Sequence, residues 1–376
     1  MITHVPPMGW NTWNTFAGEV DKQLVLSSAD ILAESGLKDA GYEYVVIDDC
    51  WALKERDKNG KLVPNPEKFP HGMKYVADYI HAKGLKFGMY SCCGTMTCAE
   101  FPASFDREYT DARTFAEWDV DFLKYDYCFK PSSVEGKLLF RRMGLALANS
   151  GRDILFSGCS GGLDATHEWI GSTGANMWRS TPDIMDTWES IKNLIIRQYD
   201  ILPFGGQGCF NDMDMLVVGM NGRGHVGLKG CTADEYRVHF AAWCLLGSPL
   251  MIGCDIRNMD AEAKAILTNP ALIAIDRDAR CAHPYIIRQS DNDEYPLIVR
   301  HLADGDIAFG FFNLSDSAAN LWIPLADLGI SFTQGKSAEG KDVYTGKPLA
   351  LKNETLFATV PPHGCEVYRL KIKDIK

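Results

Sequence analysis

Short apolar runs alternate with amphipathic stretches along most of the chain. Residues 44–47 (YVVI) form a run rich in β-branched side chains. The stretch 21–40 before it carries apolar residues at helical spacing and stops at Gly41, as an α-helix does. The same alternation predicts a strand at each of the segments 8–13, 86–91, 121–127, 154–160, 177–181, 209–216 and 249–256.

Strands that alternate with helices predict a parallel sheet. Eight such repeats in about 280 residues fit an α/β fold of the (β/α)8 TIM barrel type, which we expect over residues 1–284. A doubly wound sheet is the competing arrangement. It would be favoured by a glycine-rich phosphate loop after the first strand, and this sequence has none there.

The pattern changes after residue 284. Segments such as 296–316 and 356–360 alternate apolar and polar residues, and Asp-Gly, Gly-Lys and Pro-Pro pairs interrupt them. Alternation with a period of two, broken by turn residues, is typical of antiparallel strands. We therefore expect a small C-terminal antiparallel β-sandwich domain over residues 285–376.

The composition narrows the class of protein. Of 376 residues, 46% are hydrophobic and 23% are charged, as in an ordinary globular protein. The formal charge of −11 argues against a nucleic-acid partner, because phosphates attract positive charge. No apolar stretch is long enough to span a bilayer, so we expect no membrane partner. The sequence leaves the oligomeric state open, a homo-oligomer included.

Compartment and metal content are predicted from what the sequence lacks. The first ten residues have neither the basic nor the apolar region of a signal peptide. We expect a cytoplasmic protein, with a secreted protein that has lost its signal as the alternative. The 12 cysteines and 9 histidines form no CxxC, HxH or HExxH pattern, so we expect no metal ion and no cofactor.

Acidic and aromatic residues gather where the predicted strands end. In a barrel of this kind, the carboxyl ends of the strands carry the active site. Carboxylates accept hydrogen bonds from hydroxyl groups, Lys and Arg donate them, and tryptophan packs on apolar surface. These ends therefore predict a cleft for a polyhydroxylated ligand. They carry Trp10, Trp13, Asp48, Asp49, Trp51, Tyr90, Lys124, Asp126, Ser160, Arg179, Asp183, Asp212 and Asp214.

Two of these carboxylates are candidates for catalysis. Asp126 follows Lys124 by two residues, so both side chains lie on one face of a strand. A nearby ammonium lowers the pKa of a carboxylate, which suits a nucleophile. Asp183 follows the sixth strand, where capping a helix is the alternative role. Glycoside hydrolysis uses two such carboxylates.

Seven segments resemble the signature blocks of glycoside hydrolase family 27, the α-galactosidases and α-N-acetylgalactosaminidases. They occur in order: MGWNTWNTF (8–16), VIDDCW (46–51), GLKFGMYSCCGTMTC (84–98), FLKYDYC (122–128), WRSTPDIMDTW (178–188), NDMDMLVVG (211–219) and SPLMIGCDIRNMD (248–260). The resemblance implies a (β/α)8 barrel with a C-terminal β-sandwich. It also implies a retaining exo-glycosidase, an α-galactosidase that acts on galactose-containing oligosaccharides or glycoconjugates.

The resemblance also implies roles for individual residues. Asp126 matches the nucleophile and Asp183 the general acid/base. The remaining matches are to residues that bind the sugar. Asp48 and Asp49 match the pair that binds the 4- and 6-hydroxyls, and Lys124 matches the residue that binds the 3- and 4-hydroxyls. Trp13 and Tyr90 match residues that pack against the sugar, and Arg179 and Asp214 match residues around the 2-hydroxyl. Cys98 and Cys128 match a pair at the edge of the site that is disulfide-bonded in secreted relatives. In a cytoplasmic protein the two can remain thiols, so the sequence leaves open whether they form a disulfide.

One position departs from the α-galactosidase pattern. α-Galactosidases carry a Glu for the 2-hydroxyl where this chain has Ser160. A serine is what the N-acetylgalactosaminidases of the family carry, whereas Leu163 matches the galactosidases. An α-N-acetylgalactosaminidase is therefore the alternative function. A non-catalytic sugar-binding protein is a third hypothesis, opposed by the presence of both carboxylates.

Overall fold

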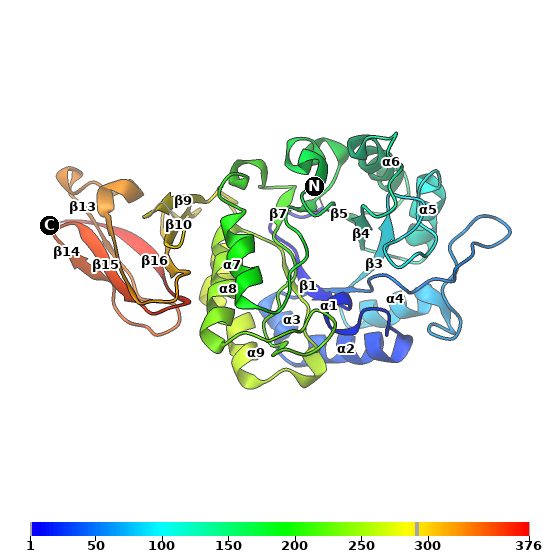
Figure 1. Ribbon diagram of the computed structural model, residues 1–376, viewed down its shortest axis with the longest axis horizontal. Helices are drawn as coiled ribbons and strands as arrows, with labels where there is room; N and C mark the ends of the chain where they lie inside the picture. Colours follow the sequence, from blue (N-terminus) through cyan, green and yellow to red (C-terminus); the bar gives the residue numbers. More distant parts are fainter. Residues whose placement is uncertain (1, 290–292, 376) are drawn as a thin grey trace.

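A parallel sheet forms the centre of the N-terminal domain (Figure 1). The computed structural model describes residues 2–289 and 293–375, and the elements named here are those of the described residues. The sheet order is β7-β6-β5-β4-β3-β2-β1-β8. Its strands are β1 (Met8–Asn11), β2 (Tyr44–Val46), β3 (Lys86–Cys92), β4 (Phe122–Asp126), β5 (Leu155–Cys159), β6 (Met177–Arg179), β7 (Phe210–Asp212) and β8 (Leu250–Ile252).

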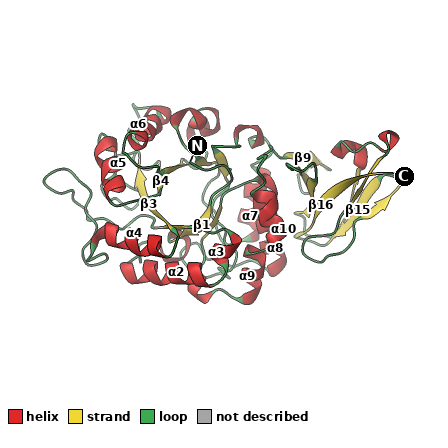
Figure 2. Ribbon diagram, turned by 180° about the vertical axis from the view of Figure 1, so that it is seen from behind, coloured by secondary structure: helices red, strands yellow, loops and turns green. Residues whose placement is uncertain are grey.

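The two ends of this sheet meet and close the barrel. Leu216, which follows β7, forms a parallel bridge with Ile252 of β8. The Leu216 N–H donates to the Met251 carbonyl over 2.7 Å, and the Gly253 N–H donates to the Leu216 carbonyl over 2.9 Å. Figure 2 shows the strands as a ring with helices outside it. The (β/α)8 barrel predicted from the sequence is confirmed.

Helices between the strands cover the outside of the ring. Asp21 caps α2 by accepting the Leu24 N–H, and Thr232 forms a capping box with Glu235 at α8. The single helix predicted over 21–40 is two helices, because Gly36 adopts a left-handed conformation (φ 89°). The helices are α1 (Trp13–Phe16), α2 (Lys22–Glu34), α3 (Leu37–Ala40), α4 (Gly72–Ala82), α5 (Glu108–Glu117), α6 (Gly136–Ala148), α7 (Trp188–Ile196), α8 (Ala233–Leu246), α9 (Ala261–Leu267) and α10 (Pro270–Asp276).

The C-terminal strands pair antiparallel in two packed sheets, with orders β13-β16-β11-β10-β9 and β12-β15-β14. Apolar side chains of both sheets, such as Leu297 and Leu356, form a separate core. The predicted β-sandwich is confirmed, and its boundary at residue 285 stays a prediction. The strands are β9 (Tyr285–Arg288), β10 (Pro296–His301), β11 (Ile307–Asn313), β12 (Ala319–Pro324), β13 (Lys336–Glu339), β14 (Ala350–Lys352), β15 (Thr355–Val360) and β16 (Gly364–Asp374).

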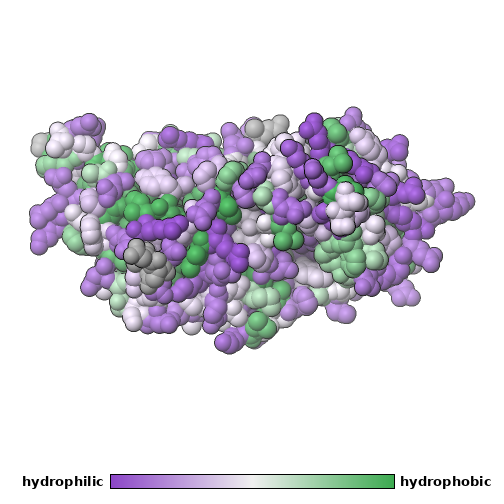
Figure 3. Space-filling view, turned by 45° about the horizontal axis from the view of Figure 1, so that its top comes forward, coloured by the Kyte–Doolittle hydropathy of each residue, from purple (hydrophilic) through white to green (hydrophobic). Residues whose placement is uncertain are grey.

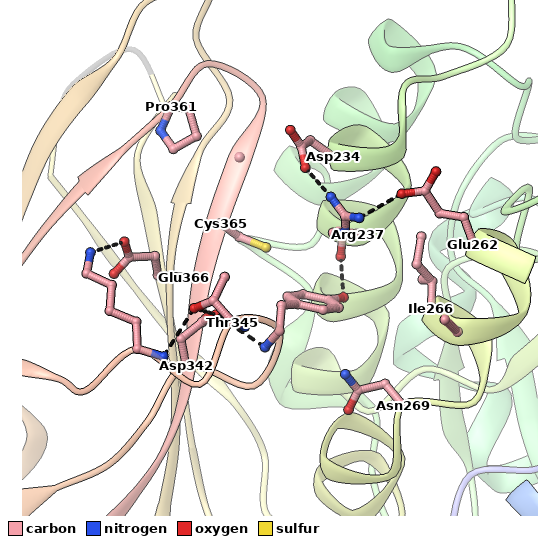
Figure 4. Close-up of a pocket in the computed structure, with 14 residues that line it drawn as sticks. Asp234, Arg237, Glu262, Ile266, Asn269, Asp342, Thr345, Pro361, Cys365 and Glu366 are labelled. Carbon is pink, nitrogen blue, oxygen red and sulfur yellow. Dashed lines mark hydrogen bonds and ion pairs between the residues drawn. The ribbon is translucent and has the colours of Figure 1, made fainter.

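A cleft of about 540 Å³ lies where the sandwich meets α8 and α9 (Figure 4). Arg237 on α8 is ion-paired with Asp234 (2.5 Å) and with Glu262 on α9 (2.7 Å). The Tyr344 hydroxyl of the sandwich donates to the Arg237 carbonyl over 2.9 Å. These contacts join the two domains. Among the described residues, no strand end of the barrel lines this cleft, so it is separate from the predicted sugar site.

Hydrophilic side chains cover most of the face seen in Figure 3, with smaller hydrophobic groups between them. One hydrophobic group lies on the C-terminal domain, toward the left of the view. Within the described part of the chain, every helix is too short or too polar to cross a bilayer.

Candidate active site

The strand ends bring the predicted residues to one end of the barrel. Because the strands are parallel, their carboxyl ends share one edge of the sheet. Tyr90 of β3 lies opposite Lys124 of β4 in the register of the two strands. Cys159 of β5 lies opposite Arg179 of β6. Asp126 is the last residue of β4, so it lies at the same edge.

Asp126 is held by hydrogen bonds to both of its carboxylate oxygens. The Tyr127 N–H donates to Oδ1 over 2.8 Å, and the Tyr90 hydroxyl donates to Oδ2 over 3.0 Å. Lys124 and Asp126 are both half-buried, while Tyr125 between them packs in the core outside the barrel. The predicted common face of Lys124 and Asp126 is confirmed. Asp126 is thus fixed in orientation beside a cation.

A disulfide joins Cys98 and Cys128 beside Asp126. The Cys98 sulfur lies 3.6 Å from Asp126 Oδ2. Among the described residues, Cys98, Asp126 and Cys128 place ligand-type atoms within 4.8 Å of one another. Because the two sulfurs are bonded to each other, they are not free thiolates that could hold a metal ion. The pairing implied by the family resemblance is present, which answers the question that the sequence left open.

Lys124 forms an ion pair with Asp48, which follows β2. Its Nζ lies 2.8 Å from Asp48 Oδ2, and the Asn11 side-chain amide donates to the same oxygen over 2.8 Å. Burial lowers the pKa of Lys124, but Asp48 and then Asp126 raise it to a net value above the ordinary one. Lys124 therefore stays charged and hydrogen-bonded to Asp48.

Asp49 is held by the loop that follows β3. The Ala99 N–H donates to its Oδ2 over 3.0 Å, and the Cys50 N–H donates to its Oδ1 over 2.7 Å. Burial raises the pKa of Asp49, against the hydrogen bonds from Thr97 and Ala99. The loop that carries Cys98 thus also orients Asp49.

Arg179 connects two carboxylates on neighbouring loops. Its Nη2 is ion-paired with Asp183, and its Nη1 lies 2.7 Å from Asp214 Oδ1. Asp214 also accepts the Ile184 N–H over 2.7 Å. Arg179 and Asp214 are buried, whereas the Asp183 side chain is 83% exposed. A buried ion pair therefore anchors a carboxylate at the open mouth of the barrel.

Asp183 does not cap a helix. The helix α7 begins at Trp188, and the side chain of Thr187 caps it by accepting the Ser190 N–H over 3.2 Å. Asp183 lies in the loop between β6 and this cap. The capping role considered for Asp183 is therefore wrong, and its exposed carboxylate pairs with Arg179 instead of a helix N-terminus.

The pKa of Asp126 is raised above its ordinary value, whereas the pKa of Asp183 is lowered. Burial raises the pKa of Asp126, although Lys124 and the Tyr127 N–H favour the ionised form. The prediction of a lowered pKa for Asp126 is wrong in net direction. Lys124 lowers this pKa as predicted, but burial raises it by more. At Asp183, nearby protein atoms raise the pKa by displacing part of the water around the exposed carboxylate, but Arg179 and then Lys124 lower it below its ordinary value. Asp126 ends β4 and Asp183 follows β6, so both carboxylates lie at the carboxyl-end edge of the barrel.

A small cavity of about 20 Å³ lies under the site, inside the barrel. This volume is sufficient for one water molecule. Burial raises the pKa of Asp214 on its wall to about 6, against the attraction of Arg179. The cavity is lined by Asn11, Phe122, Lys124, Ser157, Cys159, Met177, Arg179, Asp212, Asp214, Met215 and Met251.

The chain matches known proteins over nearly its whole length. Residues 5–278 match the family of α-galactosidase A, and residues 292–370 match the α-galactosidase C-terminal β-sandwich domain. The α-galactosidase of Cyamopsis tetragonoloba is 38% identical over 370 residues, which are 98% of this chain and 87% of that protein. The chain belongs to the α-galactosidase family. This family is glycoside hydrolase family 27, so the resemblance found in the sequence is confirmed.

Solved structures of this family share the fold. The crystal structure of α-galactosidase I from Mortierella vinacea has a TM-score of 0.90 and 34% identity, over 98% of this chain and 97% of that one. The α-galactosidase of Saccharomyces cerevisiae, solved with raffinose, has a TM-score of 0.87 and 29% identity, over 98% of both chains.

Ser160 is the residue where the sequence predicts a departure from the α-galactosidase pattern. It is buried, and its hydroxyl lies 2.6 Å from the Thr166 hydroxyl. Leu163, between them, is 60% exposed. Trp13 is half-buried, and its ring meets His225 edge-on at 5.5 Å. The roles in sugar binding that the sequence analysis gives to Ser160 and Trp13 stay predictions.

Three residues that support the site were not among the predicted ones. Asn11 orients Asp48, Thr97 bonds to Asp49, and Cys159 lines the cavity between Lys124 and Arg179. Asn11 is the last residue of β1 and lies within the strand predicted at 8–13, so the sequence offered a signal for it. The partner of Thr97 depends on the path of a loop, and no sequence pattern indicates it.

Proposed function

We propose that this chain hydrolyses terminal α-linked galactose with retention of configuration at the anomeric carbon. Asp126 is the nucleophile and Asp183 the general acid/base. Asp126 ends β4 and Asp183 follows β6 of the same barrel. Two carboxylates at the carboxyl-end edge of one barrel, in a member of the α-galactosidase family, are the observation that carries the proposal.

In the first step, an oxygen of Asp126 bonds to the anomeric carbon while the bond to the leaving oxygen breaks. Asp183 gives its proton to that oxygen. In the second step, Asp183 takes a proton from water, the water oxygen bonds to the anomeric carbon, and the bond to Asp126 breaks. The hydrogen bonds from Tyr127 and Tyr90 hold the Asp126 carboxylate in place for the attack.

Asp183 must carry a proton when the substrate arrives, yet Arg179 favours its ionised form. We therefore expect the sugar and its leaving group to displace water around Asp183. This loss of water raises the cost of a charge on Asp183 and favours its protonated form. Asp183 is exposed, so a substrate can reach it directly.

Asp48, Asp49 and Lys124 supply the hydrogen-bonding groups for the sugar ring. Asp48 and Asp49 accept hydrogen bonds from hydroxyl groups, and Lys124 donates them. Their orientations are fixed by Asn11 and Ala99. We propose that this set selects the axial 4-hydroxyl of galactose, with Trp13, Tyr90 and the Cys98–Cys128 disulfide as walls.

Hydrolysis of p-nitrophenyl α-D-galactopyranoside tests the proposal. We expect release of p-nitrophenol by the wild-type chain and a loss of at least about 10³-fold in kcat for Asp126→Asn. Asp153→Asn, which replaces an exposed carboxylate before β5, is the control and should retain activity. A wild-type chain that is folded and inactive on this substrate would contradict the proposal.

Ser160 supports a second candidate function, that of an α-N-acetylgalactosaminidase. A serine leaves more room than a glutamate at the sugar's second carbon, where a 2-acetamido group would lie. The 2-acetamido analogue of the same substrate separates the two functions. A kcat/KM that is far higher for the analogue than for the galactoside would assign the second function.

The remaining expectations concern the whole chain. We propose residues 1–284 as the catalytic domain and 285–376 as the β-sandwich domain. We also propose a galactose-containing oligosaccharide or glycoconjugate as substrate.

The predicted cytoplasmic location conflicts with the Cys98–Cys128 disulfide, because disulfides persist mainly in oxidising compartments. The redox state of this pair in freshly isolated protein decides between the two compartments.

A further inference from the structure

Two aromatic side chains occupy the outer face of the sheet β12-β15-β14. Along β12, Leu321 and Ile323 are buried in the sandwich core, whereas Trp322 between them is 52% exposed. On β15, Phe357 is 44% exposed. Trp322 and Phe357 are directly opposite each other in the antiparallel register. This aromatic pair therefore stands at positions where an exposed sheet face ordinarily carries polar residues.

The fold itself makes little use of the aromatic pair. Cross-strand aromatic residues stabilise a sheet when their rings pack together. Within residues 2–289 and 293–375, neither ring contacts another aromatic ring, and the Trp322 indole N–H has no acceptor. Only the main chain of Trp322 is bonded, to the side-chain amide of Gln289. Two ring faces and one hydrogen-bond donor are thus available to a ligand.

Uncharged polar groups adjoin the aromatic pair. The Thr359 hydroxyl donates to Asn320 Oδ1 over 2.8 Å, across the neighbouring pair of the same two strands. A groove of about 530 Å³ runs beside this face, lined by Gln289, Asn320 and Trp322 among others. Aromatic surface beside amide and hydroxyl groups is the composition of a site for polyhydroxylated ligands.

Charge on this face is low. Arg288, which also lines the groove, lies 3.5 Å from Asp200 and 3.3 Å from Asp293. Asp327 lines the groove and Lys352 lies on β14, so the two signs are mixed. A face with no excess of one sign favours a neutral ligand over a polyanion.

The size of the aromatic pair decides between a sugar chain and a second copy of the protein. An aromatic side chain buries about 150–250 Å², so two half-exposed ones offer roughly 200 Å². A stable protein interface buries about 800 Å² on each partner. The pair is too small to hold a second copy, and it matches one or two pyranose rings.

We propose that the aromatic pair and its groove form a second carbohydrate site that binds a neutral polysaccharide with α-galactosyl side groups. Trp322 and Phe357 pack against the sugar rings of the chain, while Asn320 and the indole N–H bond to hydroxyls. The galactosyl part of this assignment rests on the proposed function. A polymer held at the sandwich raises the effective concentration of its side groups at the barrel.

Binding of the full chain to soluble galactomannan, measured by affinity gel electrophoresis, tests the second site. We expect Trp322→Ala to weaken this binding about tenfold, because it removes an aromatic contact and a donor. KM for release of galactose from the polymer should rise by a similar factor. Hydrolysis of p-nitrophenyl α-galactoside should not change. Phe332→Ala is the matched control, since Phe332 is 47% exposed on the same domain but lies outside the sheet.

Two outcomes would overturn the second site. One is galactomannan binding by Trp322→Ala equal to that of wild type. The other is a wild-type dimer that becomes a monomer in light scattering when Trp322 is replaced, which would make this face a subunit interface. A wild type that hydrolyses neither substrate, yet binds galactomannan through Trp322, would refute the proposed function and support the second site.

Discussion

The buried Arg179 guanidinium is ion-paired with the exposed carboxylate of Asp183. Arg179 is fixed from below, because Asp214 pairs with it at 2.7 Å and the Thr181 carbonyl accepts its Nε–H over 3.1 Å. An exposed side chain is ordinarily mobile, and this pairing reduces that mobility. The buried Arg179 cation thus holds Asp183, the proposed acid/base, in position and lowers its pKa.

Replacing Arg179 by Gln should raise the pKa of Asp183, because Arg179 favours its ionised form. The descending limb of kcat against pH reports loss of the proton from the general acid in the enzyme–substrate complex, where we expect Asp183 to be protonated. We expect this limb to move to higher pH, and kcat to fall about 10- to 100-fold as Asp183 loses its orientation. Arg113→Gln, on the exposed surface of α5, is the control. A pH profile with an unmoved limb would rule out this role of Arg179.

The Cys98–Cys128 disulfide should support both stability and substrate binding. It links residues 30 positions apart, and its removal should cost about 2–4 kcal/mol of unfolding free energy. Its loop also carries Ala99, which orients Asp49, so KM should rise. We expect both effects in the double variant Cys98→Ser/Cys128→Ser, measured by thermal unfolding and steady-state kinetics.

Cys209→Ser is the control for the disulfide experiment, because Cys209 is a free and half-buried thiol. It should leave both KM and the unfolding temperature close to those of wild type. Dithiothreitol should act on the wild type as the double substitution does. If the double variant keeps its KM, the disulfide does not support Asp49.

Asp276 on α10 should make the protein less stable as the pH rises. Its side chain is fully buried, and neither oxygen has a hydrogen-bond partner among the described residues. Burial raises the pKa of Asp276 well above its ordinary value, despite Arg300 and Arg277. The folded chain therefore retains a proton that the unfolded chain loses above about pH 4, so stability falls with pH from there upward.

Asp276→Asn removes this ionisable group at similar volume. We expect its unfolding temperature to exceed that of wild type by roughly a few degrees at pH 8, and the difference to shrink toward pH 4. Asp39→Asn, at an exposed position, should show no such dependence. An equal difference at both pH values would show that Asp276 is ionised in the folded state.

The sequence indicated most of the fold because the apolar runs are local signals. The run 44–47 and the strand β2 coincide, and the acidic residues after it lie at the active end of the barrel. The strands also repeat often enough to indicate a closed barrel. The helix predicted over 21–40 was too long, since only the structure shows Gly36 in a left-handed conformation.

Pairings across strands could not be predicted in the same way. Lys124 and Asp126 are two residues apart, and sequence proximity suggested that they are partners. The closed barrel instead places Lys124 2.8 Å from Asp48, which is 76 residues away. Which of two carboxylates a lysine meets depends on strand register and burial, and both arise only in the folded chain.

Trapping of the covalent intermediate tests the central claim most directly. A fluorinated α-galactosyl fluoride, which slows the second step, should leave one glycosyl group on the protein, visible in the intact mass. Peptide mapping should place this group on Asp126, and Asp126→Asn should take up none. A label on another residue would contradict the account. So would full hydrolytic activity of Asp126→Asn.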